Sequence, residues 1–358
     1  MEIDIERIKI SALNRIYGFK PREGLALLER YGSAAAVPGI PEGNEAEELE
    51  WLYARGHRLL SCLDEDYPPL LAETPDHPIG LYYSGISSPR EIFGYRRAIA
   101  IVGTRDISSY GAHWCREIVR ALARTADKPV IVSGFAIGTD IIAQTEALEV
   151  GLPTIAVMPV GPDCIYPSRH RDIAMRLVST AGCALVSDYP PGTTAMASNF
   201  IRRNRIIAGL ADAVILIESK SKGGGLITMD FAVDYGRDTF ALPGRIEDST
   251  SAGCNNLIRR SKAQLITDPE SLVEDLGLGL LSSRGKIPLS TLAGRSYGTD
   301  SLEYTIFEHI RCQRGITPDD LCLDLNLPYP RIIAALTRLQ TDGFVNSDIL
   351  QRYYINTR

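Results

Sequence analysis

Residues 98–111 read AIAIVGTRDISSYG, a run of five apolar residues that meets a glycine and an arginine and then continues with helical spacing. A short, wholly apolar run suits a strand buried on both faces. The same alternation of apolar run and helical pattern recurs as far as residue 242. The other runs are Val130–Ser133, Thr154–Met158, Ala184–Ser187, Ala213–Ile217 and Thr239–Leu242, with helical patterns at 109–124, 139–150, 168–179, 197–209 and 225–236. The pattern predicts an α/β fold with a doubly wound parallel sheet, in which ligands bind beyond the carboxyl ends of the strands.

The chain on either side of this core has a different texture. Residues 1–60 predict short helices separated by turns, a small helical domain. Residues 276–300 are rich in glycine and serine and predict a linker. Residues 301–358 predict three helices followed by a two-stranded ribbon, the pattern of a winged-helix domain. The core domain is therefore expected to span residues 61–275.

Composition excludes several classes of protein. The 358 residues carry a net charge of −6 from 38 basic and 44 acidic side chains, so a site for a polyanion must be local. Seven cysteines without a C-x-x-C pair indicate neither a disulfide framework nor a zinc site. The N-terminus has no signal-peptide pattern, and no stretch approaches the ~20 apolar residues of a membrane span. We expect a soluble, cytoplasmic protein without a membrane segment or a metal.

The stretch FIRRNRIIAG, residues 200–209, carries local positive charge at a predicted helix start. Arginine side chains bind backbone phosphates, and an aromatic face stacks on bases, so this mixture favours single-stranded nucleic acid. The alternative is a solvated helical face, with Ile206 and Ile207 on its buried side.

Three turns after predicted strands could also bind a ligand. Thr104 and Arg105 follow Gly103, where a dinucleotide-binding turn would place further glycines. Arginine beside a helix start with Ser108 and Ser109 as caps suits a phosphate. The alternative is a structural turn in which Arg105 pairs with a carboxylate.

The second and third of these turns are rich in glycine. Ser133 and Gly134 precede Asp140, which could cap the next helix or orient Arg105. The residues 222–225, KGGG, can form a backbone nest for an anion, or simply a tight turn. No histidine pair at metal spacing and no nucleophile motif occurs, so the residues indicate no catalytic group and no cofactor.

Taken in order, these motifs resemble the DNA-processing protein A (DprA, or Smf) family over about residues 60–270. The resemblance implies an extended Rossmann-like sheet between an N-terminal domain like a SAM or helix-hairpin-helix domain and a C-terminal winged helix. The motifs that carry it are Ile101–Arg105 with Ser109–Gly111, Val132–Asp140, Thr154–Val157 followed by Ile165–Pro167, Arg203–Leu210, Gly225–Thr228, Gly236–Gly244 and Gly253–Ile258.

The resemblance also implies a function. Family members bind incoming single-stranded DNA during natural transformation (competence), protect it, load the RecA recombinase for DNA recombination and act as homodimers, without enzymatic activity. To the residues that match the family's DNA-binding positions we add two more. We expect Arg202 to replace in part the arginine that the family usually has at the position of Ile137, and Gly224 belongs to the glycine-rich turn. The positions that then match DNA-binding residues are Gly103, Thr104, Arg105, Ser133, Gly134, Phe200 as the stacking aromatic, Arg202, Arg203, Asn204, Arg205 and Gly224.

The chain departs from the family pattern at several positions. Ile137 stands where the family usually has arginine, Gln144 where it often has histidine, and Ile201 where it has proline. Gly223 and Gly225 replace serines. We therefore assign no DNA contact to Ile137 or Gln144.

Two further hypotheses remain open. A nucleotide-monophosphate-hydrolysing enzyme of the cytokinin-activating type would use Gly223–Gly225, Thr228 and Asp230, although the spacing differs from that family's loop. The last 58 residues carry six basic and seven acidic side chains, and Arg331 and Arg338 are the basic residues of the third helix. This charge predicts a protein-contact or regulatory role for the winged helix. The sequence does not define the surfaces that would bind a second copy or a recombinase.

Overall fold

The structure is a computed structural model that describes residues 3–41, 43–94, 97–279, 293–294, 296–313, 315–348 and 351–355. The chain forms two compact units, Met1–Ala123 with Lys128–Pro269, and Arg124–Asp127 with Glu270–Arg358. Most of the predicted linker, residues 280–292 and 295, lies outside the described residues.

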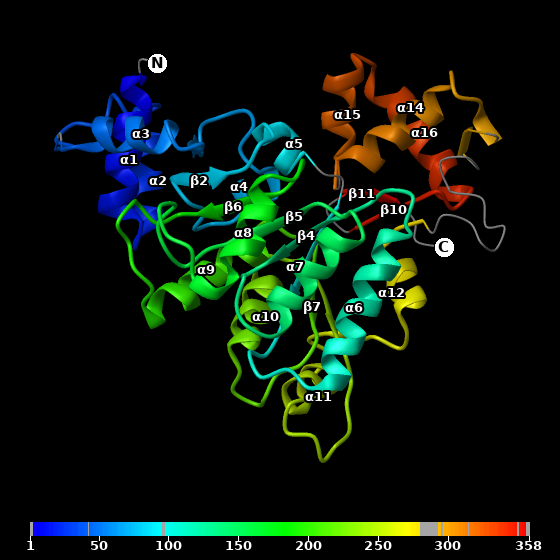
Figure 1. The fold of residues 1–358 in the computed structure, drawn as a ribbon. Coiled ribbons are helices and arrows are strands. Elements are labelled where there is room, and N and C mark those ends of the chain that lie inside the picture. The colour runs from blue at the N-terminus through cyan, green and yellow to red at the C-terminus, as the bar shows by residue number, and fades with distance from the viewer. Residues whose placement is uncertain are drawn as a thin grey trace. The chain divides into compact units, whose positions relative to one another are not determined.

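A nine-stranded sheet forms the centre of the first unit, in the order β1-β2-β6-β5-β4-β3-β7-β8-β9 (Figure 1). All neighbouring pairs from β6 to β9 are parallel, whereas β1 and β2 pair antiparallel. The strands are β1 (His57–Ser61), β2 (Gly80–Ser84), β3 (Ala98–Val102), β4 (Val130–Ser133), β5 (Thr154–Val157), β6 (Ala184–Ser187), β7 (Ala213–Leu216), β8 (Asp238–Ala241) and β9 (Gln264–Leu265). The six strands predicted from apolar runs are confirmed as β3 to β8, with ends that agree to within one residue.

Helices connect these strands in two directions from β3. They are α6 (Ser109–Ala123), α7 (Thr139–Glu149), α8 (Arg171–Val178, after a 3-10 turn at Ser168–His170), α9 (Ala197–Gly209), α10 (Gly224–Asp234) and α11 (Ala252–Arg259). The first three lead outward to β6, and α9 returns the chain to β7 on the other side of β3. Because such crossovers are right-handed, α6 packs beside α7 on one face and α9 beside α10 on the other. Strands are added in one direction from β3 to β6 and in the opposite direction from β7 to β9. The order therefore reverses between β3 and β7, and ligands bind at this point in such folds.

Three N-terminal helices, blue in Figure 1, pack against the first two strands. They are α1 (Ile5–Tyr17), α2 (Pro21–Tyr31) and α3 (Glu45–Tyr53), and we call them the N-terminal module. Ile10, Leu13 and Leu49 share one buried cluster with Leu59 of β1 and Ile79 beside β2. The module thus belongs to the first unit, and its SAM-like class stays a prediction. Two short helices, α4 (Pro69–Ala72) and α5 (Pro89–Phe93), flank β2.

The second unit contains most of α12 (Pro269–Asp275) and the elements expected of the C-terminal segment. These are α14 (Leu302–Cys312), α15 (Pro318–Leu325), α16 (Tyr329–Thr341) and the antiparallel pair β10 (Val345–Ser347) and β11 (Tyr353–Ile355). Thr317 caps α15 and accepts a hydrogen bond from the backbone N–H of Asp320 at 3.2 Å. The winged-helix assignment stays a prediction. Among the described residues, no helix has the length and apolar character needed to cross a membrane.

Gly138 allows the loops after β3 and β4 to lie against each other. Its φ is +85°, and a Cβ there would meet the carbonyl oxygen of Thr104 at 2.4 Å and that of Arg105 at 2.7 Å. Gly151 has a φ of +69° but open space within 4 Å. We expect Gly151→Ala to lower the free energy of unfolding by about 1 kcal/mol, because only the backbone conformation is strained.

Gly138→Ala adds a backbone clash at a φ of +85° and a ψ of −124°, a conformation that non-glycine residues rarely adopt, so its loss should be larger by about 1–3 kcal/mol. Denaturant unfolding of both variants measures the difference. Equal losses would contradict a close contact between the two loops.

Candidate nucleic-acid interface

Three flat side chains form a row at the carboxyl edge of the parallel strands. The guanidinium carbon of Arg105, which follows β3, lies 4.7 Å from the ring centroid of Phe200 in the first turn of α9. The ring of Tyr166, from the loop after β5, meets Phe200 edge to face at 5.5 Å. Arg105 and Tyr166 are exposed and Phe200 is half-buried. We call this set the Arg105–Phe200–Tyr166 row.

The row has the chemistry of a site for a single strand. Arg105 makes no ion pair with any other residue that the structure describes, so the carboxylate partner considered from the sequence is not seen there. Its guanidinium can bind a phosphate, and an aromatic platform can stack on a base of any kind. Tyr166 belongs to the Ile165–Pro167 motif, but no local pattern predicts a binding role for it.

Gly103 and Thr104 shape the loop that presents Arg105. The Thr104 carbonyl accepts hydrogen bonds from the backbone N–H and the hydroxyl of Thr139, each at 3.2 Å. A Cβ on Gly103 would meet the Thr139 hydroxyl oxygen at 2.4 Å. Both residues therefore fix the path of the backbone beside Arg105.

The glycine-rich turn before α10 lies next to α9. Asn204 donates a hydrogen bond to the carbonyl of the exposed Gly224 at 3.4 Å. Lys220 and Lys222 of the same loop are exposed, and Lys220 lies 3.9 Å from the Asp106 carboxylate. An ion pair this long between exposed side chains is weak, so both lysines contribute positive charge beside Arg105.

A carboxylate occupies the N-terminus of α6. Glu218, which is 1% exposed, accepts hydrogen bonds from the backbone N–H of Ser108 at 2.8 Å and from its hydroxyl at 2.6 Å. Ser108 caps α6, as expected, by accepting a hydrogen bond from Gly111 at 3.1 Å. The Glu218 carboxylate thus already uses the positive end of this helix, and a phosphate contact at the helix start stays a prediction. Glu218 follows β7 and is distant from Ser108 in the sequence, so no local pattern around Ser108 predicts the contact between the two residues.

Arg203 lies in the interior and not on the surface that carries the Arg105–Phe200–Tyr166 row. It is 3% exposed and donates hydrogen bonds to the carbonyls of Gly134 and Val157, at the ends of β4 and β5. Burial lowers the pKa of Arg203 to about 10, an effect that the Asp140 carboxylate opposes. The negative charge of Asp140 thus favours the charged form of Arg203. The Asp140 carboxylate itself accepts a hydrogen bond from the backbone N–H of Ala136 at 3.3 Å.

Ser133 and Gly134 have structural partners as well. Ser133 is fully buried and donates to the Ile101 carbonyl at 2.6 Å, which joins β4 to β3. A Cβ on Gly134 would lie 2.6 Å from the guanidinium carbon of Arg203, so glycine leaves room for that arginine. DNA contacts by Ser133, Gly134 and Arg203 stay predictions.

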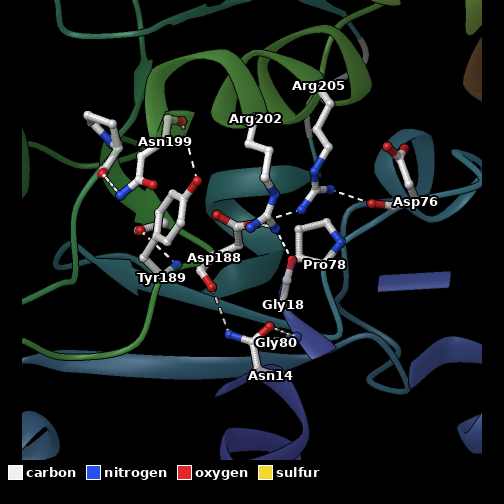
Figure 2. A network of polar contacts seen from close by, with 12 residues as sticks. Asn14, Gly18, Asp76, Pro78, Gly80, Asp188, Tyr189, Asn199, Arg202 and Arg205 are labelled. Atoms are coloured by element: carbon white, nitrogen blue, oxygen red, sulfur yellow. Dashed lines mark hydrogen bonds and ion pairs between the residues drawn. The ribbon is translucent and has the colours of Figure 1, made fainter. Parts of the chain in front are cut away.

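Arg205 points away from the surface and pairs with Asp188, the residue after β6 (Figure 2). Both side chains are almost fully buried, and Arg205 Nη2 lies 2.5 Å from Asp188 Oδ2. Arg205 also donates to the Asp76 carbonyl, and Asn14 of α1 donates to the Asp188 carbonyl at 2.7 Å. The pair therefore joins α9, β6 and the N-terminal module.

Arg202 reaches the same carboxylate from α9 (Figure 2). It lies 3.4 Å from Asp188 Oδ2 and donates to the Gly18 carbonyl. Its guanidinium carbon is 4.3 Å from the ring centroid of Phe19 and 5.5 Å from that of Tyr189. The sequence of α9 predicts that Arg202, Arg203 and Arg205 bind phosphates. In the structure, Arg202 and Arg205 instead hold α9 against the rest of the unit. Their DNA contacts stay predictions.

The groups considered for hydrolysis do not assemble into a catalytic pair. Thr228 is 1% exposed, and the exposed Asp230 carboxylate lies 3.4 Å from the ammonium of Lys262. Gln144 is fully buried and donates to the Ile155 carbonyl at 3.1 Å, which agrees with its having no assigned DNA contact. The described residues contain no group of three or more side chains placed to hold a metal ion.

Known proteins resemble this chain over most of its length. The family model described as DNA recombination-mediator protein A matches residues 58–277. Protein Smf from Escherichia coli is 34% identical over 310 residues, which are 86% of this chain and 79% of the relative. DNA processing protein DprA from Streptococcus pneumoniae is 38% identical over 217 residues, or 60% of this chain and 73% of the relative.

Two solved structures share the fold. The structure of DNA processing protein A from Streptococcus pneumoniae has a TM-score of 0.66 and 30% identity, with coverage of 76% of this chain and 98% of that chain. A structure on the single-stranded DNA binding mode of DNA processing protein A from Helicobacter pylori has a TM-score of 0.54 and 30% identity. It covers 62% of this chain and 95% of that chain.

Asp188→Ala tests whether the buried ion pair holds α9 in place. The variant leaves Arg205 buried without its carboxylate, and losing one partner of a buried pair costs about 3–5 kcal/mol. We expect that loss in the free energy of unfolding, measured with denaturant. Glu149→Ala is the matched control, because Glu149 and Arg176 form an exposed pair at 2.8 Å that contributes about 1 kcal/mol or less. Similar losses for both variants would contradict the role of Asp188.

Proposed function

This chain belongs to the DNA recombination-mediator protein A family, and from that premise we propose that it binds single-stranded DNA at the Arg105–Phe200–Tyr166 row. The family is one of DNA-binding recombination mediators and not of enzymes. The observation that carries the proposal is the Arg105 guanidinium, which lies 4.7 Å from the Phe200 ring at the carboxyl edge of the sheet. The Helicobacter pylori relative, whose structure concerns its single-stranded DNA binding mode, supports the same ligand.

In the proposed site, exposed residues contact the DNA and less accessible residues hold those residues in place. A base stacks on Phe200, which Tyr166 holds from its edge, and Arg105 binds a phosphate next to that base. The loop backbone at Gly103 and Thr104, the Asn204 amide and the Gly224 turn supply further polar contacts. The members that hold this surface in place are the half-buried Arg202 and the buried Ser133, Gly134, Arg203 and Arg205.

Stacking and phosphate contacts make binding independent of sequence, because every base has a flat face and every nucleotide a phosphate. Lys220 and Lys222 add positive charge beside Arg105 on a chain whose net charge is −6. The proposed ligand is therefore a short stretch of single strand at a local basic surface, and not a duplex coated along its length.

The bound strand is proposed to be a substrate for recombination. The protein would protect incoming DNA during natural transformation in the cytoplasm and load a RecA-type recombinase onto it. The name of the family, a recombination mediator, supports this step. A homodimer, which the family resemblance implies, would present two rows to one strand or to two strands.

Substitutions of the row should separate stacking from charge. Phe200→Ala should weaken binding of a single-stranded oligonucleotide by about 1–3 kcal/mol and leave the salt dependence unchanged, since no charge is removed. Arg105→Ala should weaken binding and lower the slope of log affinity against log salt by about 0.7, the value for one phosphate contact. Fluorescence anisotropy over a salt series measures both quantities.

Arg90→Ala is the matched control for these variants. Arg90 is an exposed arginine of α5, which follows β2. Because β2 runs antiparallel to β6, its carboxyl end lies at the sheet edge opposite the row. We expect wild-type binding for Arg90→Ala. Wild-type affinity for both row variants would contradict the proposed function.

Loading should depend on the same row. The measurement is the DNA-dependent ATP hydrolysis of a RecA-type recombinase on single strands covered by a single-strand-binding protein. Wild-type protein should shorten the lag before hydrolysis begins, and Phe200→Ala should restore the lag because the mediator no longer holds the strand. A lag that wild-type protein leaves unchanged would contradict the loading step while leaving DNA binding intact.

A further inference from the structure

Phe19 is an aromatic side chain held outward in the turn between α1 and α2. It is 64% exposed, among the most exposed of the large apolar side chains that the structure describes. The Arg202 guanidinium carbon lies 4.3 Å from its ring centroid, and the Tyr189 ring is tilted by 59° at 6.3 Å. The cation and the second ring fix the position of Phe19 while much of the ring still faces solvent.

This arrangement repeats the chemistry of the Arg105–Phe200–Tyr166 row. In each place a phenylalanine contacts one guanidinium and one tyrosine. Positive charge is also present here, because Lys20 and Arg22 follow Phe19 and are exposed. Glu23 partly offsets it through an ion pair with Lys20 at 3.0 Å. A base could therefore stack on Phe19 near a cation, as on Phe200.

The two aromatic sites lie along the same edge of the sheet. Tyr189 comes two residues after β6, Arg105 follows β3, and both strands end at the carboxyl edge. In the order β6-β5-β4-β3 the two ends are three strand spacings apart, or about 14 Å at ~4.8 Å per strand. Successive nucleotides of one strand rise about 3.4 Å along the axis of a duplex, so roughly four stacked nucleotides span this distance, and an extended strand needs fewer.

The start of α9 connects the two sites. Phe200 and Arg202 both lie in its first two turns, and Figure 2 shows Arg202 reaching from α9 toward Gly18, next to Phe19. Two apolar side chains of this helix start are open to solvent, Met196 at 60% and Ile201 at 51%. Exposed apolar groups at this helix start offer a surface that bases and sugars can cover.

We propose that Phe19 is a second base-stacking site, so that the N-terminal module forms part of the path of a single strand that crosses the start of α9. The inference rests on the proposed function, because it extends the same strand from the row to the module. The proposal gives the N-terminal module a contact with nucleic acid, in addition to its packing against β1 and β2. Arg202 then has two tasks, holding the module through Gly18 and supporting the Phe19 ring.

The length of the oligonucleotide tests this path. Binding of oligothymidylates of about 2 and about 12 nucleotides is measured by fluorescence anisotropy, the shorter one being too short to reach from the row to Phe19. Phe19→Ala should weaken binding of the longer strand about tenfold, within the range for one lost stacking contact, and leave the shorter strand unaffected. Phe19→Trp, which keeps a stacking face, should bind both strands as the wild type does.

Two other variants complete the comparison. Trp51→Ala is the matched control, since Trp51 is 44% exposed, lies 4.1 Å from the Arg55 guanidinium carbon and belongs to α3, which packs on β1. It should bind both strands normally. Phe200→Ala should weaken both.

The outcomes separate the second site from the first. Wild-type affinity of Phe19→Ala for the longer strand, together with weakened binding by Phe200→Ala, would overturn the second site and leave the proposed function standing. An equal loss by Phe19→Ala on both lengths would also overturn it, because a separate site predicts a dependence on length. Undiminished binding by both Phe200→Ala and Arg105→Ala would overturn the proposed function itself.

Discussion

The buried ion pair between Arg205 and Asp188 is the interaction on which the placement of α9 depends. A buried guanidinium is tolerated only where a counter-charge and hydrogen-bond acceptors replace water. Asp188 follows β6, and the backbone carbonyls that bind Arg203 end β4 and β5. These partners come from three neighbouring strand ends, so they fix both the rotation and the height of α9 against the sheet. Phe200 is carried to the surface as a consequence.

The same edge explains why a fold shared with dinucleotide-binding proteins suits a polymer here. In such proteins the first helix start after the central strand is free to bind a pyrophosphate. In this chain the Glu218 carboxylate occupies that helix start, with hydrogen bonds of 2.6 and 2.8 Å to Ser108. The accessible binding groups are instead a guanidinium and aromatic faces on the outer rim. Groups on a rim contact a strand that passes over the surface, whereas an inner cradle encloses one nucleotide.

Prediction from the sequence succeeded where burial alone determines the pattern. Strands β3 to β8 are apolar runs because helices cover both faces of the sheet. Strand β1 begins with the polar residues His57 and Arg58, and β1 pairs antiparallel with β2. The first two strands therefore did not show the repeated apolar runs from which the other strands were predicted. Within the site, the residue types at Arg105 and Phe200 indicated nucleic acid, but the inward direction of Arg203 and Arg205 was not predictable. Asp188 is 17 residues from Arg205, and Asp140 lies after a different strand from Asp188. Only the folded sheet brings these carboxylates to α9.

Several weak contacts along one edge are better suited to a mediator than one deep site. Each stacked base contributes about 1–3 kcal/mol, so a strand on the proposed path can leave one platform while it is held by the next. A recombinase could then take over the strand in short segments without having to break all contacts at once. The local basic surface supports this mode, because exposed charges attract the strand from a distance but release it as salt or a competing protein screens them.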